Sequence, residues 1–385
     1  MPIEQMASKT RIVMLSDMNP KRRMLKYVLG VAVVILAIGI FSFQYPRLVT
    51  QIVFGANTSP VELALRGSYG AREGDEKTAA IASAATAFLA SLNDAQRKAA
   101  TYAFSDNAQR SNWSNFPEGM FPRGGLKLGE LTEAQRANLE NLLAEFMSEK
   151  GARNIDYQLA AADTLRSSRF MKYGSEFYSV AFLGEPSTER PWMFQFGGHH
   201  LAVNITVYGP DVSFSPMLTG GSPLRLRYGG REIFITEEET TAARTFLDSL
   251  NSAQKKRAVR GEQAIDLQSG PGKYGTVPAP EGIKGGDLTD TQKGLLLGVI
   301  AARLGFINAD DYAAKMATVK AEIDDTHFGW WGPQDVRDAA YFRVTGPSIV
   351  LEYAPQDGGS ATGHAHNIYR NPRNDYGSAW IGIGR

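Results

Sequence analysis

The stretch FLASLNDAQRKA (88–99) recurs later in the chain as FLDSLNSAQKKRA (246–258), and this repeat indicates how the chain is organised. A second pair of segments keeps nearly the same register. GLKLGELTEAQ (125–135) returns as GIKGGDLTDTQ (282–292), at an offset of 157 residues against 158 for the first pair. Two matches at one spacing indicate an internal duplication, because chance similarity between helical segments would not keep a common offset.

A weaker correspondence extends the repeat toward the C-terminus. Gly184 and Gly198 are separated by the same number of residues as Gly332 and Gly346. Strand-like segments follow the second glycine of each pair. This register places Asn204 opposite Glu352.

Each half has the same predicted order of elements, with helices first and strands after them. An amphipathic helix opens the half, and a Gly-rich loop leads to a second helix. Thr132 or Thr289 is its N-cap, with glutamine three residues on, which is a capping-box pattern. Segments such as HLAVNITVYG and SIVLEYAP then have the composition of strands. We expect an α+β fold of two related halves, residues 76–230 and 231–385, with antiparallel strands and a pseudo-two-fold axis. One joint sheet and two separate domains both satisfy this pattern.

Composition limits the classes of function. The 385 residues include 41 Lys and Arg against 40 Asp and Glu, and this net charge of +1 argues against a nucleic-acid binder that works through bulk charge. The absence of cysteine excludes disulfide frameworks, thiolate metal sites and cysteine nucleophiles. The chain has no G-x-x-x-x-G-K-[ST] loop and no G-x-G-x-x-G that opens a helix, and HExxH and GxSxG are absent as well.

A single long apolar run, YVLGVAVVILAIGIFSF, occupies residues 27–43. As a helix it would rise about 25 Å, close to the thickness of the hydrocarbon core of a bilayer. Basic residues precede the run and few charges follow it. The positive-inside rule therefore predicts a cytoplasmic tail (1–26), a transmembrane anchor (27–43) and an extracytoplasmic remainder that begins with a stalk (44–75). A cleaved signal peptide is the alternative, although FQYP at 43–46 offers no small-residue cleavage site.

Four of the five histidines occur in two short motifs, GGHH and GHAH. Histidines two apart on a strand share a face, so His364 and His366 have a spacing that can chelate one ion. His199 and His200 are adjacent and point to opposite faces of an extended chain, which leaves one of them as a direct ligand. The remaining histidine, His327, is assigned to a structural role or to the rim of the site.

Glu352 interrupts the otherwise apolar segment IVLEYA, where a buried carboxylate is costly unless it is paired or bound to a metal. We predict one metal site at the interface of the halves, with Glu352 also as a catalytic base. The predicted ligands are His199, His200, Glu352, His364 and His366. Imidazole and carboxylate without thiolate suit a divalent transition metal: Zn, Fe, Mn, Ni or Cu(II). Two alternatives stay open, a metal-free polar cleft and unrelated histidines on the surface or in the core.

The segment after the last histidine adds charged candidates. Arg370 could receive a small anionic ligand through a bidentate contact, and we assign it a catalytic role. Asp375 could orient a ligand imidazole through the second ring nitrogen of that imidazole.

The runs WMFQFGGHHLAVNITV, FGWWGP and HAHNIYRNPRNDYG, together with ASLNDAQRKAA and GLKLGELTEAQ, resemble the family called domain of unknown function 3500. The resemblance covers residues 76–377 and implies a similar fold. It also implies a shared site made of His199, His200, Asn204, Glu352, His364, His366, Arg370 and Asp375. It supplies no activity.

These observations predict an exported, membrane-anchored protein with a His/Glu metal site between two duplicated halves. It is either a metalloenzyme, of the hydrolase or oxidoreductase class, or a non-catalytic metal-handling or ligand-binding protein. A metal-free interaction module is the third interpretation. The expected partners are the membrane and a small anionic ligand, and no nucleic acid.

Overall fold

The computed structural model describes residues 61–168, 171–335, 339–356 and 363–383. The predicted cytoplasmic tail and the apolar run at 27–43 lie outside these residues, as does most of the predicted stalk. None of the described helices has the length and apolar character needed to cross a bilayer. The membrane anchor therefore stays a prediction.

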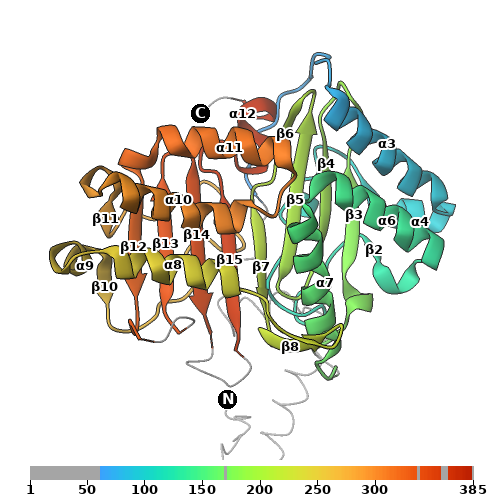
Figure 1. The fold of residues 1–385 in the computed structure, drawn as a ribbon. Helices are drawn as coiled ribbons and strands as arrows, with labels where there is room; N and C mark the ends of the chain where they lie inside the picture. The colour runs from blue at the N-terminus through green and yellow to red at the C-terminus, as the bar shows by residue number, and fades with distance from the viewer. Residues whose placement is uncertain (1–60, 169–170, 336–338, 357–362, 384–385) are drawn as a thin grey trace, which may run out of the picture.

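One large mixed sheet extends through the described part of the molecule (Figure 1). Its strands are β1 (Thr101–Tyr102), β2 (Leu126–Lys127), β3 (Ser179–Leu183), β4 (Trp192–Gly198), β5 (Leu201–Tyr208), β6 (Asp211–Ser213), β7 (Met217–Gly221), β10 (Val259–Gly261), β11 (Ile283–Lys284), β12 (His327–Trp331), β13 (Tyr341–Gly346), β14 (Ile349–Pro355) and β15 (Ala365–Arg370). The order is β1-β3-β4-β5-β7-β15-β14-β13-β12-β10, with β2, β6 and β11 paired to β3, β5 and β12. A separate hairpin joins β8 (Arg225–Tyr228) to β9 (Arg231–Phe234).

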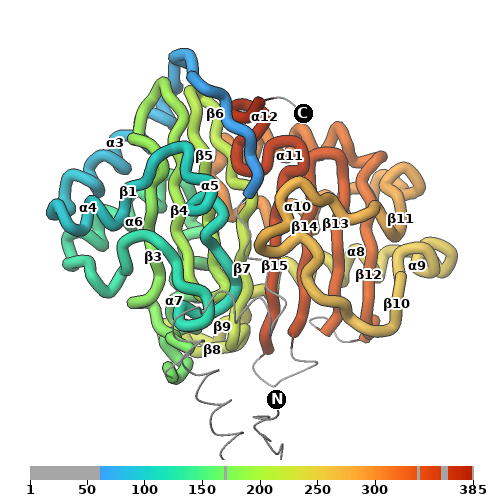
Figure 2. The backbone as a smooth tube through the Cα atoms, turned by 180° about the vertical axis from the view of Figure 1, so that it is seen from behind, coloured from blue at the N-terminus to red at the C-terminus, as the bar shows by residue number. Residues whose placement is uncertain are grey.

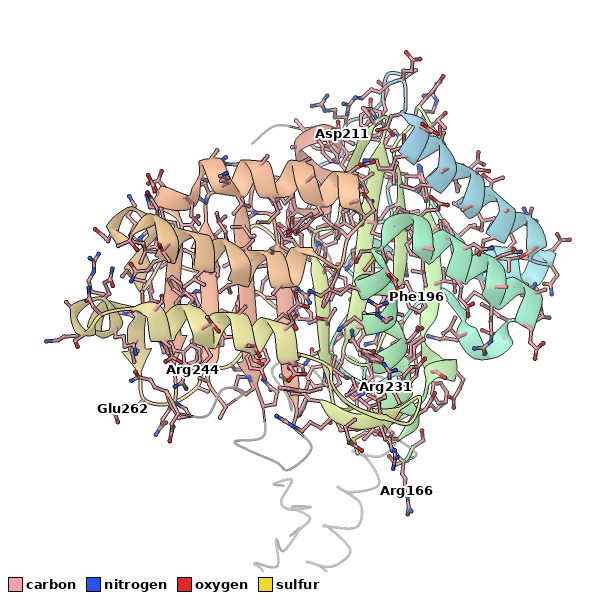
Figure 3. The ribbon with its side chains drawn as sticks, viewed as in Figure 1. Arg166, Phe196, Asp211, Arg231, Arg244 and Glu262 are labelled. Atoms are coloured by element: carbon pink, nitrogen blue, oxygen red, sulfur yellow. The ribbon has the colours of Figure 1, made fainter. Side chains whose placement is uncertain are left out.

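Helices cover one face of the large sheet. The described helices are α3 (Glu76–Ser91), α4 (Asp94–Ala100), α5 (Asn107–Arg110), α6 (Glu133–Phe146), α7 (Glu149–Asp163), α8 (Glu237–Ser249), α9 (Ser252–Ala258), α10 (Asp290–Leu304), α11 (Ala309–Ala321) and α12 (Ser378–Ile381), of which α5 lies on the opposite face. The long ones lie on the face seen in Figure 1, where α3 packs on α6 and α8 packs on α10. Phe196 of β4 is buried in the core, whereas Arg166 projects into solvent at one end of the molecule (Figure 3).

Irregular segments cover the opposite face of the sheet. The connection from β1 to β2, which contains α5, and the connection from β10 to β11 both cross the strands on this side (Figure 2). This face holds the candidate site.

The capping residues predicted from the sequence are confirmed in both halves. Thr132 is the N-cap of α6 and Thr289 is the N-cap of α10, and each accepts the N–H of the glutamine three residues on at 3.3 Å, within a complete capping box. The side chain of this glutamine also donates to a second glutamine at 2.9 Å, Gln96 in the first half and Gln254 in the second. The same amide pair therefore ties α4 to α6 and α9 to α10.

The strand pairings of the first half recur in the second. β3 pairs in parallel with β1 and antiparallel with β2 and β4, and β4 pairs antiparallel with β5. β12 pairs in the same way with β10, β11 and β13, and β13 with β14. The expectation of antiparallel strands needs correction for the two edge pairs. They are parallel because helices connect β1 to β3 and β10 to β12, and such long crossovers permit parallel pairing.

Two antiparallel contacts join the halves. In the sheet, β7 pairs with β15. On the helical face, the junction of α6 and α7 meets the junction of α10 and α11. There the Ser148 N–H donates to the Phe306 carbonyl at 3.0 Å, and the Asn308 N–H donates to the Phe146 carbonyl at the same distance. The sheet is therefore continuous across the boundary expected between residues 230 and 231.

Candidate metal centre

The two histidine motifs meet at one end of the sheet. β7 runs antiparallel to both β5 and β15, so β5 and β15 begin at the same end. His200 precedes β5, and His366 lies near the start of β15. Gly220 of β7 pairs with His366, and a Cβ there would lie 2.2 Å from the Ala365 carbonyl oxygen. The missing side chain therefore lets β15 approach β7 closely, and the rings of His200 and His366 stack with centroids 4.8 Å apart.

His364 completes a group of three. One ring nitrogen from each of His200, His364 and His366 lies within 4.8 Å of the others, so the group could hold a metal ion. The Nε2 atoms of His364 and His366 are 3.3 Å apart. Two nitrogens bound to a tetrahedral zinc ion at about 2.0–2.1 Å would themselves be about 3.3 Å apart. This pair therefore already has the spacing of two ligands.

A strained turn places His200 in this group. His199 and His200 form the two-residue turn between β4 and β5, since Gly198 pairs with Leu201 across it. His200 has a φ of +60°, a left-handed conformation that costs a residue with a side chain about 1–2 kcal/mol. Its N–H donates to the Asn115 carbonyl at 3.4 Å. Strain of this kind, held by the surrounding structure, suggests a functional constraint.

Two of the three rings are buried as neutral imidazoles. His200 is 3% exposed and His366 is 6% exposed. Burial, and then the charge of neighbouring histidines, holds the pKa of His200 well below its usual range. Burial, and then His364, lowers the pKa of His366 to about 3. Neutral imidazole is the form that binds metals. Among the described residues, neither ring nitrogen of His200 has a hydrogen-bond partner.

His199 lies beside the group and outside it. Its ring meets Tyr173 edge-on at 4.9 Å and lies 3.8 Å from the ring of His200, measured between centroids. Burial, and then the charge of Arg123, holds its pKa well below the usual range. Of the two adjacent histidines, His200 alone belongs to the group of three.

The histidines line an open cavity of about 510 Å³, a size suited to a small-molecule ligand. Both halves contribute to it. The lining comes from segments 114–120, 171–173 and 199–200 of the first half and from segments 266–273 and 364–366 of the second. Segments 114–120 and 266–273 belong to the connections from β1 to β2 and from β10 to β11, so corresponding loops form two walls of the cavity. We call 114–120 the first wall and 266–273 the second wall.

Arg123 holds the first wall. Its guanidinium donates to the carbonyls of Ser114 and Phe116 at 2.6 Å and to the carbonyl of Gly198 at 2.9 Å. The first wall is thereby fixed to the end of β4, next to the turn that carries His200.

Arg370 holds the second wall. Its Nε donates to the Ser269 carbonyl at 2.7 Å and its Nη2 to the Gly270 carbonyl at 2.9 Å, while Nη1 pairs with Asp375. Asp375 also accepts from the Ser215 hydroxyl at 2.5 Å, and burial raises the pKa of its carboxyl. All three guanidine nitrogens of Arg370 are thus engaged within the protein. Asp375 meets a guanidinium and a hydroxyl, where the sequence predicted an imidazole.

Glu352 is buried outside the histidine group. Its Oε2 accepts from the Gln268 N–H at 2.6 Å and from the Tyr341 hydroxyl at 2.9 Å. Since Gln268 belongs to the second wall, this carboxylate positions the same loop as Arg370. A role for Glu352 as a ligand and catalytic roles for Glu352 and Arg370 stay predictions.

Asn204 and His327 also lie outside the group. Asn204 accepts from Gln195 at 2.9 Å on the neighbouring strand and donates to the Pro216 carbonyl at 3.0 Å, so its amide is committed within the sheet. His327 begins β12, which is separated from β15 by β13 and β14.

Sequence reasoning missed two residues of the site, Asn115 and Arg123. The Asn115 amide nitrogen lies 3.2 Å from the Nε2 of His366. The surrounding stretch SNWSNFPEG has the composition of an ordinary loop, and no local signal shows that it crosses the sheet above the histidines.

The family resemblance is confirmed. The family model described as "Protein of unknown function (DUF3500)" matches residues 74–378, which include the three histidines and both walls of the cavity. No curated protein and no solved structure matches the chain.

Proposed function

The chain belongs to the DUF3500 family, and we propose that it is an exported, membrane-anchored metalloprotein whose ion is bound by His200, His364 and His366. We assign it to the metalloenzymes, of the hydrolase or oxidoreductase class, acting on a small anionic substrate. The ion is a divalent transition metal, chosen from Zn, Fe, Mn, Ni and Cu(II), because imidazole ligands without thiolate suit these ions.

One observation carries the proposal. The imidazole of His200 is buried, has no hydrogen-bond partner among the described residues and lies within reach of two further imidazoles. The unpartnered nitrogens cost about 1–3 kcal/mol, in addition to the backbone strain of about 1–2 kcal/mol. A bound ion would offset both costs, since structural zinc sites contribute about 10 kcal/mol or more.

Three ligands beside a cavity favour an enzyme over a carrier. Catalytic zinc sites use three protein ligands and leave the fourth position to water or substrate, whereas structural sites close with four. The group of three histidines lines a cavity of about 510 Å³. An ion at an open position would polarise a bound substrate or lower the pKa of a bound water.

A metal-free ligand-binding protein is the second candidate. The Nε2 of His366 has partners without an ion, because it lies 3.3 Å from the Nε2 of His364 and 3.2 Å from the Asn115 amide. In that case the ring nitrogens would hold a polar ligand directly.

We further propose that the halves arose by duplication and are related by a pseudo-two-fold axis. The recurring strand pairings, the matching glutamine pairs and the reciprocal bonds between the two helix junctions support this.

The basic residues before the apolar run at 27–43 support an anchor that leaves the remainder outside the cytoplasm. Membrane fractionation tests this proposal. Full-length protein should stay with the membrane through a high-salt wash, and its release by salt would contradict the anchor.

Metal analysis tests the site. Full-length protein purified without a histidine tag should carry about one ion per chain, and the double variant His364→Ala/His366→Ala should lose it. His327→Ala is the matched control, since it removes a histidine outside the group and should leave the metal content unchanged. Equal metal content in the wild type and the double variant would remove the metal site.

A further inference from the structure

Asn115 contacts two of the three histidines. Its carbonyl accepts the His200 N–H at 3.4 Å, and its Nδ2 lies 3.2 Å from the Nε2 of His366. Adjacent ligand atoms of a tetrahedral zinc ion are about 3.3 Å apart. The Asn115 amide nitrogen therefore lies as close to the Nε2 of His366 as a neighbouring ligand atom would, and it borders the space in which an ion and a further ligand would bind.

Ser114 determines which end of the amide faces His366. The Ser114 hydroxyl oxygen accepts the Phe116 N–H at 3.2 Å and lies 3.4 Å from the Oδ1 of Asn115. The hydroxyl hydrogen can thus be donated to Oδ1, and this turns Nδ2 with its two hydrogens toward His366. Arg123 holds the backbone on both sides of Asn115 through the carbonyls of Ser114 and Phe116.

An ion and the amide N–H cannot both use the lone pair of His366 Nε2. When an ion binds, the Asn115 amide loses this acceptor, yet Arg123 keeps its segment in place. Asn115 is half-buried and lines the cavity, so a group bound at the free coordination position could accept from its amide. We propose that Asn115 donates to an oxyanion bound at this open position. The site would therefore take small substrates that present a carboxylate or phosphate group to the metal. The inference rests on the proposed metal site.

The chemistry of an oxyanion fits the arrangement. Its negative charge would be attracted to the divalent ion, and its oxygens would accept the amide hydrogens, so one substrate group would satisfy both neighbours. Aspartate at this position would replace the donor by a second negative charge and should repel the same ligand.

Cobalt(II) titrations of the full-length protein test the proposal, because the visible absorption of bound cobalt changes when an anion enters its coordination shell. Acetate and inorganic phosphate are the probes. We expect Asn115→Ala to keep its cobalt and to bind both anions about tenfold more weakly, and Asn115→Asp to bind them more weakly still. The matched control is Asn112→Ala, whose amide donates to Gln109 in the same segment and which should behave as the wild type.

The outcomes separate this proposal from the metal site itself. Unchanged anion affinity in Asn115→Ala would overturn the role of Asn115 while leaving the metal site in place. Loss of the cobalt spectrum in that variant would also overturn it, because Asn115 would then act as a ligand or support the fold. If the wild type takes up no cobalt or other divalent metal, this inference and the proposed function both fall.

Discussion

Replacing His200 by glycine should stabilise the metal-free protein and abolish its stabilisation by metal. The substitution relieves the positive φ, worth about 1–2 kcal/mol, and removes two buried ring nitrogens without partners, worth about 1–3 kcal/mol. Against this, glycine costs about 0.5–1 kcal/mol in chain entropy. The lost ring contacts with the other histidines cost about 1–2 kcal/mol. The net expectation is a gain of about 1 kcal/mol in the free energy of unfolding without metal.

Urea denaturation of the full-length protein in detergent, with a chelator and then with excess zinc, measures both effects. At a zinc concentration 100-fold above its dissociation constant, the wild type should gain about 2.7 kcal/mol and the glycine variant little, so their order of stability reverses. His200→Ala retains the strained φ and should be less stable than the glycine variant, while His327→Ala should keep the zinc effect. Equal stabilisation of the wild type and the glycine variant by zinc would contradict this prediction. So would a metal-free glycine variant whose unfolding free energy is more than about 1 kcal/mol below that of the wild type.

Three further predictions concern groups around the site and on the helical face. Glu352→Ala should keep its metal while losing about 1–3 kcal/mol of unfolding free energy, because the buried Tyr341 hydroxyl loses its acceptor and the Gln268 N–H loses its link to the strand. Metal analysis beside urea denaturation checks this, and lost metal would identify Glu352 as a ligand. Arg370→Met should cost about 3–5 kcal/mol, since the Asp375 carboxylate stays buried without its partner. The double variant Arg370→Met/Asp375→Asn should recover part of the lost unfolding free energy. If the losses of the two single variants are fully additive in a double-mutant cycle, the two side chains do not stabilise each other. Burial lowers the pKa of Lys315 to about 8 from 10.5, so the unfolded chain binds more protons between these pH values and stability due to this group rises with pH across that window. Relative to Lys315→Met, the free energy of unfolding of the wild type should rise by about 1–2 kcal/mol from pH 8 to 10.5, a figure reduced because the side chain is partly exposed. Parallel profiles of unfolding free energy against pH for the two proteins would contradict this prediction.

The parts of the fold that depend on neighbouring residues were predictable from the sequence. Thr132 and Thr289 begin helices as expected, because a capping box involves residues within one turn. The two histidine motifs also converge as expected, although their approach depends on β7, which lies between β5 and β15 and was not predicted as a strand.

The surroundings of the charged candidates were not predictable. The sequence identified Glu352 as an unusual charge in an apolar segment and Arg370 as a charged residue close after the last histidine, and both are buried. Their partners include backbone groups of the second wall, which is about 80 to 100 residues away in the chain. Asn115 was not predicted for the same reason, because the contacts of a loop residue depend on which strands the loop crosses. Long-range pairings of this kind have no local sequence signal.

The position of the three histidines has a consequence for how the molecule holds together. His200 comes from the first half, and His364 and His366 come from the second, with only β7 between them. An ion bound by all three would cross-link distant parts of a chain that has no cysteine. Such a link would restrict the unfolded chain as a disulfide does, and it could be opened by a chelator instead of a reductant.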